Sequence, residues 1–293
     1  MSDPKVVAIG GGHGLAASLR AIRRYTSQCT AIVSVADDGG SSGRLRDLLG
    51  IPAPGDARRC LVALADADAL WAQAFEHRFT APGLDGHAFG NLVIAGLAEV
   101  LGDFTAALEE AGRLVGAVGR VLPATDVPVV LRAETAAGPI DGQVAVSMTS
   151  GIVRVSVVPV DAKCPVAAIE RVVDADQVVI GPGSLFTSVL AAVAVPALRD
   201  ALVATAARKV YVANLREQVP ETEGFDVAAH VRAMRAHGLE PDVVLCDPRG
   251  PALGDLDVAH VERPVSRPHG LAHEPELLAA ALVDLVEPRP SVG

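Results

Sequence analysis

The chain has 293 residues, of which half are hydrophobic and a fifth are charged, as expected for a globular protein with a large core. Its formal net charge of −10 argues against non-specific binding to nucleic acid or to an anionic membrane. Aromatic residues make up only 3 %, so the core must consist mainly of Val, Ala and Leu. An anionic ligand would have to be held by local groups, such as helix N-termini and a few arginines.

Three sequence features bear on where the protein works. Met1 to Lys5 leads straight into the first expected strand, without the charged and apolar regions of a signal peptide. Charge, Pro or Gly breaks each apolar run well before the ~18 residues of a membrane span. The four cysteines lie far apart without a Cys-x-x-Cys pair, which is typical of reduced thiols. We therefore expect a cytoplasmic protein without a membrane span, a disulfide or a zinc site.

The first chemical motif is a glycine-rich turn between a strand and a helix. The run Lys5–Ile9 is followed by Gly10-Gly-Gly-His-Gly14, and apolar residues then recur at helical spacing. The turn does not match Gly-x-Gly-x-x-Gly, but its glycines still let the backbone approach a phosphate at a helix N-terminus. A turn used only for chain reversal is the alternative. The residues expected to contact a phosphate are Gly11, Gly12, His13, Gly14 and Leu15.

A second strand, Ala31–Ala36, ends at an acidic loop. Asp37 stands where a Rossmann domain places its ribose-binding carboxylate. A cap for a helix beginning near Gly43, together with a solvated charge, is the alternative, but two carboxylates beside Gly-Gly exceed what capping needs. Arg44 is equally compatible with a solvated helix face. The candidate ligand contacts in this loop are Asp37, Asp38, Gly39, Ser41, Ser42 and Arg44.

Two further segments place polar residues at the starts of helices. Asp56 is expected to cap a helix, and Arg58 in its first turn opposes the helix dipole. That placement indicates a bound anion near Arg58, although a surface ion pair would also explain it. His87 and Asn91 lead into a very apolar helix, Leu92–Leu101. Asn91 can bond a base or a carbonyl group, whereas a core or capping role is the alternative for His87.

Beyond these segments the pattern changes to β and then returns to α/β. Alternation around Val153–Val157 predicts a half-exposed strand. The apolar strand Gln177–Ile180 precedes a second glycine-rich turn, which suits an anion or a simple reversal, and Lys209–Ala213 precedes another polar loop. The candidate ligand contacts at these two strand ends are Gly181, Gly183, Ser184, Leu185 and Asn214.

Strands that alternate with helices predict one α/β domain over residues 1–293. We expect a Rossmann-like, three-layer α/β/α fold with a mostly parallel sheet and an antiparallel β extension around residues 116–159. In a parallel sheet the loops 10–14, 37–43, 181–188 and 214–224 share one edge, which makes one long cleft. Two turns suited to phosphate in one cleft fit a nucleotide or a nucleotide sugar.

Four motifs resemble those of the YvcK family, the bacterial gluconeogenesis factors related to the 2-phospho-L-lactate transferase CofD. The similarity covers Lys5–Val286, and its motifs are Gly10–Gly14, VADDGGSSGRLRD from Val35, PGDARRCLVALAD from Pro54 and GPGSL from Gly181. The resemblance implies a cytoplasmic protein that binds UDP-sugars, notably UDP-N-acetylglucosamine. It also implies support of cell shape and peptidoglycan synthesis during gluconeogenic growth. We expect no required cofactor, a homo-oligomer, and a protein partner in cell-wall synthesis.

The sequence departs from the family pattern in four places. His13 stands where Thr is usual, and Arg59 replaces a usual Asn. The loop Glu217–Gly224 has a shifted proline and lacks its first glycine, and the segment Asp141–Gly151 lacks a Gly-Glu-Ser. These changes bear on ligand affinity or on the choice of sugar, and not on the fold.

Two functions of different classes follow. We favour a binding and regulatory protein without catalytic residues, in which the glycine turns hold a diphosphate. The alternative is a CofD-like transferase that moves a phospholactyl group from a nucleotide diphosphate donor. In that case Asp37 and Asp38 hold Mg²⁺ or deprotonate the acceptor. The related transferases lack Asp-Asp-Gly-Gly-Ser-Ser-Gly, which favours binding, and the failed Gly-x-Gly-x-x-Gly match places a nicotinamide dehydrogenase third.

Overall fold

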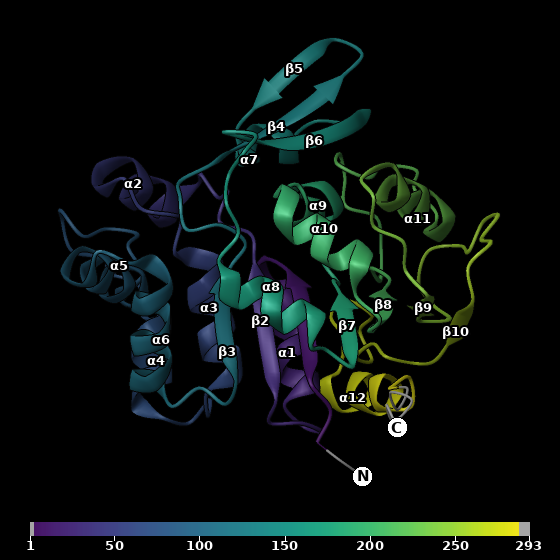
Figure 1. Cartoon of the computed structure of the whole chain (residues 1–293), viewed down its shortest axis with the longest axis horizontal. Coiled ribbons are helices and arrows are strands. Elements are labelled where there is room, and N and C mark those ends of the chain that lie inside the picture. The colour runs from purple at the N-terminus through teal and green to yellow at the C-terminus, as the bar shows by residue number, and fades with distance from the viewer. Residues whose placement is uncertain (1–2, 287–293) are drawn as a thin grey trace.

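A computed structural model describes residues 3–286, and its centre is a seven-stranded sheet (Figure 1). All neighbouring strands in it are parallel, in the order β10-β9-β8-β7-β1-β2-β3. The inner strands are buried along their whole length because helices cover both faces, which explains their continuous apolar runs. The strands are β1 Val6–Gly10, β2 Cys29–Val33, β3 Arg120–Pro123, β7 Gln177–Ile180, β8 Arg208–Val212, β9 Val243–Cys246 and β10 His260–Glu262.

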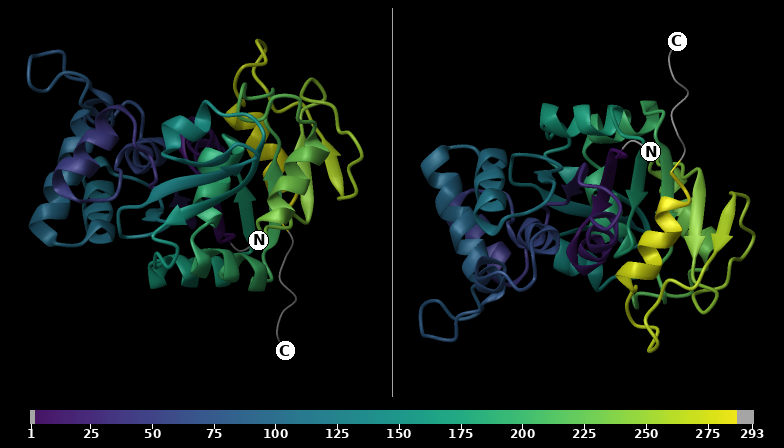
Figure 2. Two further views of the ribbon diagram at one scale, coloured as in Figure 1. Left: turned by 90° about the horizontal axis from the view of Figure 1, so that it is seen from above. Right: turned by 90° about the horizontal axis from the view of Figure 1, so that it is seen from below.

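Helices form a layer on each side of this sheet (Figure 2), which confirms the predicted α/β/α fold class. The helices on one face are α1 Gly12–Ile22, α3 Gly55–Leu64 and α12 Pro275–Val283. Those on the opposite face are α8 Val166–Val173, α9 Leu190–Val193 and α10 Pro196–Ala204.

Within residues 3–286 no single helix is long and apolar enough to cross a membrane. One pair of consecutive helical segments, Leu185–Val193 and Pro196–Ala204, is together long and apolar enough, but the pair is bent by 81°.

Further helices fill the edges of the sheet. Helix α2, Gly40–Leu49, follows β2, and α11, Val227–Ala236, connects β8 to β9. Beside α3, at the β3 edge, lie α4 Leu70–Glu76, α5 Phe89–Leu101 and α6 Phe104–Val115. Three predicted helix starts were wrong, and one of them is α5, which begins at Phe89 and not at Leu92. Helix α2 begins at Gly40 and not near Gly43, and α3 begins after Pro54, so Asp56 lies within its first turn. The short, exposed strand β10 was not predicted.

A second, antiparallel sheet has the order β5-β4-β6. Its strands, with the helix α7 between β5 and β6, are β4 Val130–Thr135, β5 Gly138–Asp141, α7 Gln143–Ser147 and β6 Ile152–Val158. The antiparallel region predicted around residues 116–159 is therefore confirmed, although β3 belongs to the parallel sheet. Burial alternates along β4, since one face of the small sheet packs inward and the other meets solvent. In Figure 1 the small sheet lies above the carboxyl ends of the central strands.

Strand β1 lies where the order of the sheet reverses. It pairs with β2 on one side and with β7, far along the chain, on the other. Such a switch point is where open α/β sheets bind ligands, at the carboxyl ends of the strands. Strands β8, β7, β1 and β2 are consecutive and parallel, so the four polar loops that follow them share one edge, as predicted.

The two glycine-rich turns touch at this switch point. A Cβ atom built on Gly14 would overlap the carbonyl oxygen of Pro182 and lie 2.7 Å from the Cα atom of Gly183. Ser18 Oγ, one helical turn further on, donates to the Gly181 carbonyl oxygen at 2.6 Å. Position 14 therefore requires glycine because the backbone of the second turn occupies the space of a side chain.

We predict that Gly14→Ala lowers the free energy of unfolding by about 1–3 kcal/mol, because the two turns must separate. Chemical denaturation measures this change. The matched control is Gly96→Ala in the middle of α5, where no atom lies within 4 Å of a built Cβ. That variant should gain about 0.5–1 kcal/mol through lower backbone entropy. A stable Gly14→Ala protein would show that the turns are not in contact in solution.

Candidate functional site

The first glycine-rich turn presents free backbone amides at the N-terminus of α1. The N-cap residue Gly11 makes no side-chain cap, and Gly12 has a left-handed φ of +60°. The amides of His13 and Gly14 have no acceptor among residues 3–286. Burial lowers the pKa of His13, and the neighbouring Arg59 lowers it further. The turn therefore offers N–H groups at the positive end of a helix, the arrangement that binds phosphate.

Asp56 connects this turn to α3. A Cβ atom built on Gly11 would lie 2.6 Å from Asp56 Oδ2, and the backbone amide of Gly12 lowers the pKa of the same carboxylate. Asp56 Oδ1 accepts from Arg59 Nη1 at 2.7 Å. Burial raises the pKa of Asp56, Arg59 opposes the rise, and the nearby Asp37 adds to it. Asp56 thus joins the first turn, Arg59 and Asp37 in one polar group.

The loop after β8 shapes the second glycine-rich turn. Asn214 accepts from the amide of Gly183 and donates to the carbonyl oxygen of the same residue, both at 2.9 Å. Gln218 Nε2 donates to Ser184 Oγ at 3.0 Å. The sequence predicts that Asn214 contacts a ligand; in this structure its side-chain amide is bonded to the turn. Asn214 therefore sets the direction of the Gly183 peptide groups.

A buried carboxylate holds the amides just beyond this turn. The chain enters the π-helix η1, Leu185–Val189, and Glu221 is 4 % exposed beside it. Glu221 accepts from the amides of Phe186 at 2.7 Å and Thr187 at 3.1 Å, and from the Thr187 hydroxyl at 2.8 Å. Burial raises the pKa of Glu221 in spite of these bonds. The amides of Ser184 and Leu185 have no acceptor in the described part of the chain, so they remain for a ligand.

The two adjacent aspartates after β2 point to different partners. Asp37 Oδ1 accepts from the amide of Gly39 at 2.9 Å, and Asp37 lines a cavity. Asp38 Oδ1 accepts from the amide of Val144, in α7, at 2.9 Å. A Cβ atom on Gly142 would lie 2.5 Å from Asp38 Oδ2. Asp38 therefore attaches α7 and the small sheet to the carboxyl edge.

The two aspartates of the predicted Mg²⁺ pair have different hydrogen-bond partners, and a third carboxylate lies nearby. Mg²⁺ bound with a nucleotide takes one or two carboxylates besides the phosphates. Asp38 is bonded to the Val144 amide, whereas Asp37 and Asp56 interact electrostatically beside the first glycine turn. Asp56 is therefore a further carboxylate that would hold such an ion with Asp37, beside the predicted pair Asp37 and Asp38. Residues 3–286 contain no group of three or more His, Cys, Asp or Glu that could hold a metal by itself.

A cavity of about 250 Å³ opens beside Asp37. Its walls come from the acidic loop and α2, from the start of α3, from the segment after α4, and from the first turn of α5. The lining residues are Asp37, Gly39, Gly40, Ser41, Ser42, Gly55, Arg58, Arg59, Arg78 and Asn91. Residues that the sequence predicts separately, in three motifs, therefore meet around one space.

A chain of hydrogen bonds joins the side chains of Asn91, Ser41 and His87 at one wall of this cavity. Asn91 Nδ2 donates to Ser41 Oγ at 3.1 Å, and Ser41 Oγ lies 3.0 Å from His87 Nδ1. Burial lowers the pKa of His87, and Arg44 lowers it further. His87 supports Ser41 from behind and does not line the cavity.

Three arginines line the cavity, namely Arg58, Arg59 and Arg78. The sequence predicts Arg44 and Arg58 as ligand contacts, so only Arg58 is common to both sets. Arg44 is exposed, donates to the Asp85 carbonyl oxygen at 2.7 Å, and does not line the cavity. Arg58 is 2 % exposed and is bonded to Glu76 and, at 3.1 Å, to the Phe75 carbonyl oxygen. The sequence marks Arg59 only as a departure from a family pattern. It gives no signal for Arg78, which belongs to no motif.

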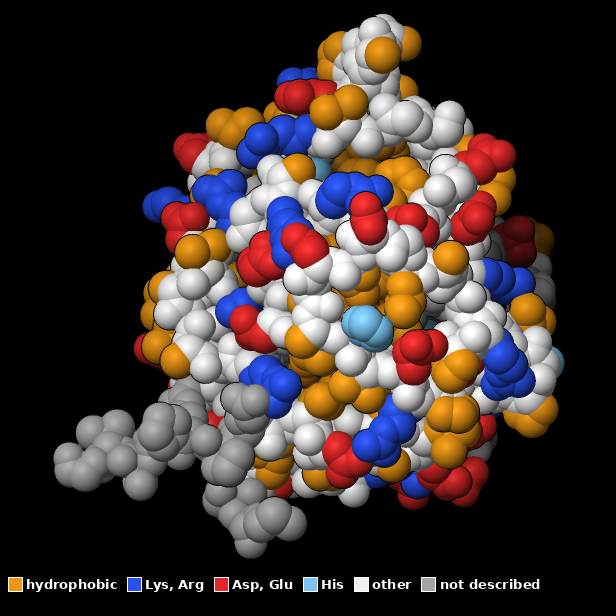
Figure 3. Space-filling model, turned by 90° about the vertical axis from the view of Figure 1, so that its right-hand side faces the viewer, with side chains coloured by type: hydrophobic (Ala, Val, Ile, Leu, Met, Phe, Trp, Pro, Cys, Tyr) orange, Lys and Arg blue, Asp and Glu red, His pale blue; other side chains and the backbone are white. Residues whose placement is uncertain are grey.

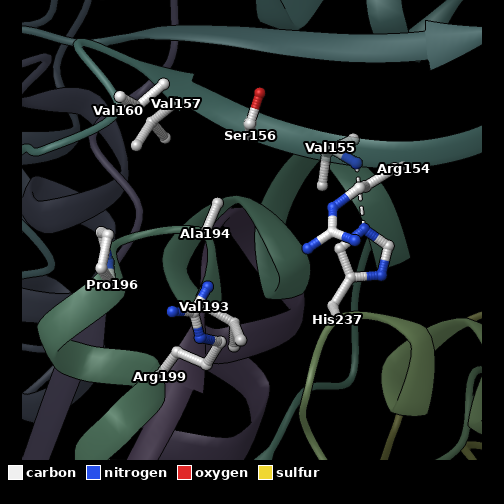
Figure 4. A pocket seen from close by; sticks show the side chains of 10 residues that line it. All are labelled: Arg154, Val155, Ser156, Val157, Val160, Val193, Ala194, Pro196, Arg199 and His237. Carbon is white, nitrogen blue, oxygen red and sulfur yellow. Dashed lines mark hydrogen bonds between the residues drawn. The ribbon is translucent and has the colours of Figure 1, made fainter.

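A second cavity, of about 160 Å³, lies between the small sheet and α10 (Figure 4). Arg154, Arg199 and His237 line it. His237 Nε2 accepts from the amide of Val155 at 2.9 Å, and Nδ1 donates to the Ala233 carbonyl oxygen at 2.7 Å. Both ring nitrogens are therefore satisfied, and His237 connects β6 to α11.

The right-hand face of the molecule shows no large area of one charge (Figure 3). Basic and acidic side chains are interspersed on it. Among the ion pairs of the described residues, Arg235 pairs with Glu240 and with Asp257, each at 2.7 Å.

The match to known proteins extends over most of the chain. The family described as "2-phospho-L-lactate transferase CofD" matches residues 6–265. The chain belongs to the CofD family. A relative from Mycobacterium leprae, named "Putative gluconeogenesis factor", is 44 % identical over 96 % of this chain and 86 % of its own length. The "Gluconeogenesis factor" of Halalkalibacterium halodurans is 41 % identical over 84 % of this chain and 78 % of its own.

Solved structures agree with these relatives. A crystal structure of a UPF0052 family member from Bacillus halodurans has a TM-score of 0.88 and 34 % identity. The likeness covers 97 % of this chain and 99 % of that one. Membership of the CofD family, in the group of gluconeogenesis factors, confirms the resemblance to YvcK proteins that the motifs indicate.

We predict that Glu221→Ala lowers the free energy of unfolding by about 1–3 kcal/mol, because it leaves buried amides at η1 without an acceptor. Thermal and chemical denaturation measure the change. Glu223→Ala, two residues away and exposed, is the control and should stay within about 0.5 kcal/mol of the unmodified chain. Equal stability of both variants would mean that water replaces the Glu221 carboxylate.

Proposed function

We propose that this member of the CofD family binds nucleotide sugars and acts as a regulatory protein. Its proposed ligands are UDP-N-acetylglucosamine and UDP-glucose. We place its action in the cytoplasm, as a homo-oligomer that supports cell shape and peptidoglycan synthesis through a protein partner. The observation that carries the binding proposal is the meeting of two glycine-rich turns, both with unpaired amides, at the switch point of a parallel sheet.

A diphosphate suits this junction. One phosphoryl group would accept from the amides of His13 and Gly14, and the other from those of Ser184 and Leu185. The contact between Gly14 and Gly183 brings the two sets of amides together. Backbone amides suffice for this binding, so an acidic protein needs no large basic surface to hold the anion.

The hydroxyl groups of the ligand would lie towards Asp37. Its Oδ1 atom is bonded to the Gly39 amide, which leaves Oδ2 to accept from a ribose or sugar hydroxyl. Asp56, which is bonded to Arg59 and lies against Gly11, would stay in the wall. In this arrangement the ligand would run from the glycine turns into the cavity beside α2.

We predict that UDP-N-acetylglucosamine in hundredfold excess over its Kd raises the Tm of the chain by about 2–10 °C. Asp37→Asn should abolish the rise, because it replaces the accepting carboxylate oxygen but can still accept from the Gly39 amide. Differential scanning fluorimetry measures both. Asp47→Asn, at an exposed position on α2, is the matched control and should keep the full rise. No rise with any UDP-sugar at millimolar concentration would refute the proposal.

A transferase of the CofD type is the second candidate, favoured by the family match over residues 6–265 and by the proximity of Asp37 and Asp56. Mg²⁺ would neutralise charge on the diphosphate of the donor. Asp37 and Asp56 would hold that ion, while Asp37 would also take the proton of the acceptor hydroxyl. The phospholactyl group would then pass to the acceptor oxygen, and a nucleoside monophosphate would leave.

A direct assay separates the two candidates. The chain is incubated with Mg²⁺, a lactyl-carrying guanosine diphosphate donor and a deazaflavin acceptor. The products are identified by mass spectrometry. For a binding protein we expect no product and no GMP. GMP release that disappears with Asp37→Asn but persists with Asp47→Asn would establish the transferase instead.

A further inference from the structure

The cavity beside α2 contains buried polar atoms that lack partners within the chain. Asn91 and Arg58 are each 2 % exposed, and both line the cavity. Asn91 Oδ1 and Arg58 Nε are two of the three buried side-chain atoms in residues 3–286 that have no hydrogen-bond partner. Folded proteins satisfy nearly all such atoms, so two of them beside one cavity indicate the place of a ligand.

These two atoms require different chemistry from that ligand. The Asn91 amide nitrogen is bonded to Ser41 Oγ, which lies 3.0 Å from His87 Nδ1. The Asn91 amide oxygen is left without a partner, and it requires a donor such as a hydroxyl group. Arg58 Nε requires an acceptor. A group that carries hydroxyls and an acidic function satisfies both.

The guanidinium groups of Arg59 and Arg78 determine which ligand charge the cavity favours. Arg59 is bonded to Asp56 at 2.7 Å, so a carboxylate already balances its charge. Arg78 donates to the Gly86 carbonyl oxygen at 2.9 Å, and no carboxylate of residues 3–286 pairs with it. Arginine matches a carboxylate in shape and in charge, and a charged acceptor forms the stronger hydrogen bond. Arg78 therefore favours an anionic group over a neutral one.

We propose that this cavity holds an acidic, hydroxylated sugar carried by the nucleotide. This rests on the proposed function, and it names the class of sugar. The cavity adjoins the first glycine turn, because Asp56 contacts Gly11 and is also bonded to Arg59. A nucleotide held at the turns would extend its sugar towards Asn91, Arg58 and Arg78. A neutral sugar satisfies Asn91 but offers the guanidinium groups only hydroxyl oxygens, which are weaker acceptors.

The experiment compares two ligands that differ at one carbon atom. UDP-glucuronic acid has a carboxylate where UDP-glucose has a hydroxymethyl group. Isothermal titration calorimetry gives the Kd of each for the full chain, for Arg78→Gln, for Arg78→Lys and for Arg154→Gln. We expect the acidic sugar to bind about tenfold tighter, and expect this ratio to fall to about one in Arg78→Gln. Arg78→Lys, which keeps the charge, and Arg154→Gln, in the second cavity, should retain the preference.

The outcomes separate this proposal from the one on which it rests. Equal affinities for the two ligands would overturn the acidic sugar and leave nucleotide-sugar binding intact. A preference that survives Arg78→Gln would overturn the placement of the sugar in this cavity. Absence of binding by either ligand would refute the acidic sugar, and absence of binding by UDP-N-acetylglucosamine as well would refute nucleotide-sugar binding. Because Arg78 is exposed, its variants should unfold at the same temperature as the unmodified chain without ligand, which a thermal scan checks.

Discussion

The contact between the two glycine-rich turns determines how the rest of the site is built. Gly14 lies against the backbone of Pro182 and Gly183, although the two turns are far apart in sequence. A parallel sheet places its strand ends side by side, but it does not by itself bring the following helices into contact. Glycine at position 14 permits that approach, and Ser18 holds it through the Gly181 carbonyl oxygen. Two helix N-termini thereby face the same point.

A network of carboxylates surrounds this junction and gives it shape. Asp56 engages the first turn, Glu221 engages the amides beyond the second, and Asp38 attaches α7. Each carboxylate accepts from backbone N–H groups at fixed positions. In a chain with a net charge of −10, these acids act as internal caps as well as solvated charges. Asp37 differs, since it lines the cavity and keeps one carboxylate oxygen available.

Much of the fold follows from local sequence pattern. Apolar runs ending in glycine and polar residues mark β1, β2, β7 and β8, and parallel pairing puts their loops on one edge. The pattern does not tell which carboxylate will find a backbone amide, because that depends on packing between distant segments. Asp38 is bonded to Val144, 106 residues away. Adjacent positions in the sequence therefore do not reveal that Asp38 is bonded to a distant backbone amide whereas Asp37 lines the cavity.

The basic side chains of the cavity show the same limit. Arg58 lies within the motif that begins at Pro54, and its charge opposes a helix dipole, so the sequence indicates it as a candidate. Arg78 follows α4 in a segment without periodicity or motif, and it reaches the cavity only because α4 and α5 pack beside α3. Arg44 belongs to the most distinctive motif but is bonded to the Asp85 carbonyl oxygen on the surface. Membership of a motif and position in the site are thus separate properties.

Glu221 also has a kinetic consequence. Its carboxylate, together with Asn214 and Gln218, keeps the second turn in shape while no ligand is bound. A ligand that binds to a preformed turn does not have to order a loop before the backbone amides can bind its phosphates. Association is then limited by diffusion and desolvation, and differences in affinity among related ligands arise mainly in how long each one stays. A regulatory binder of the kind proposed above would therefore report its ligand through the residence time and not through the association rate.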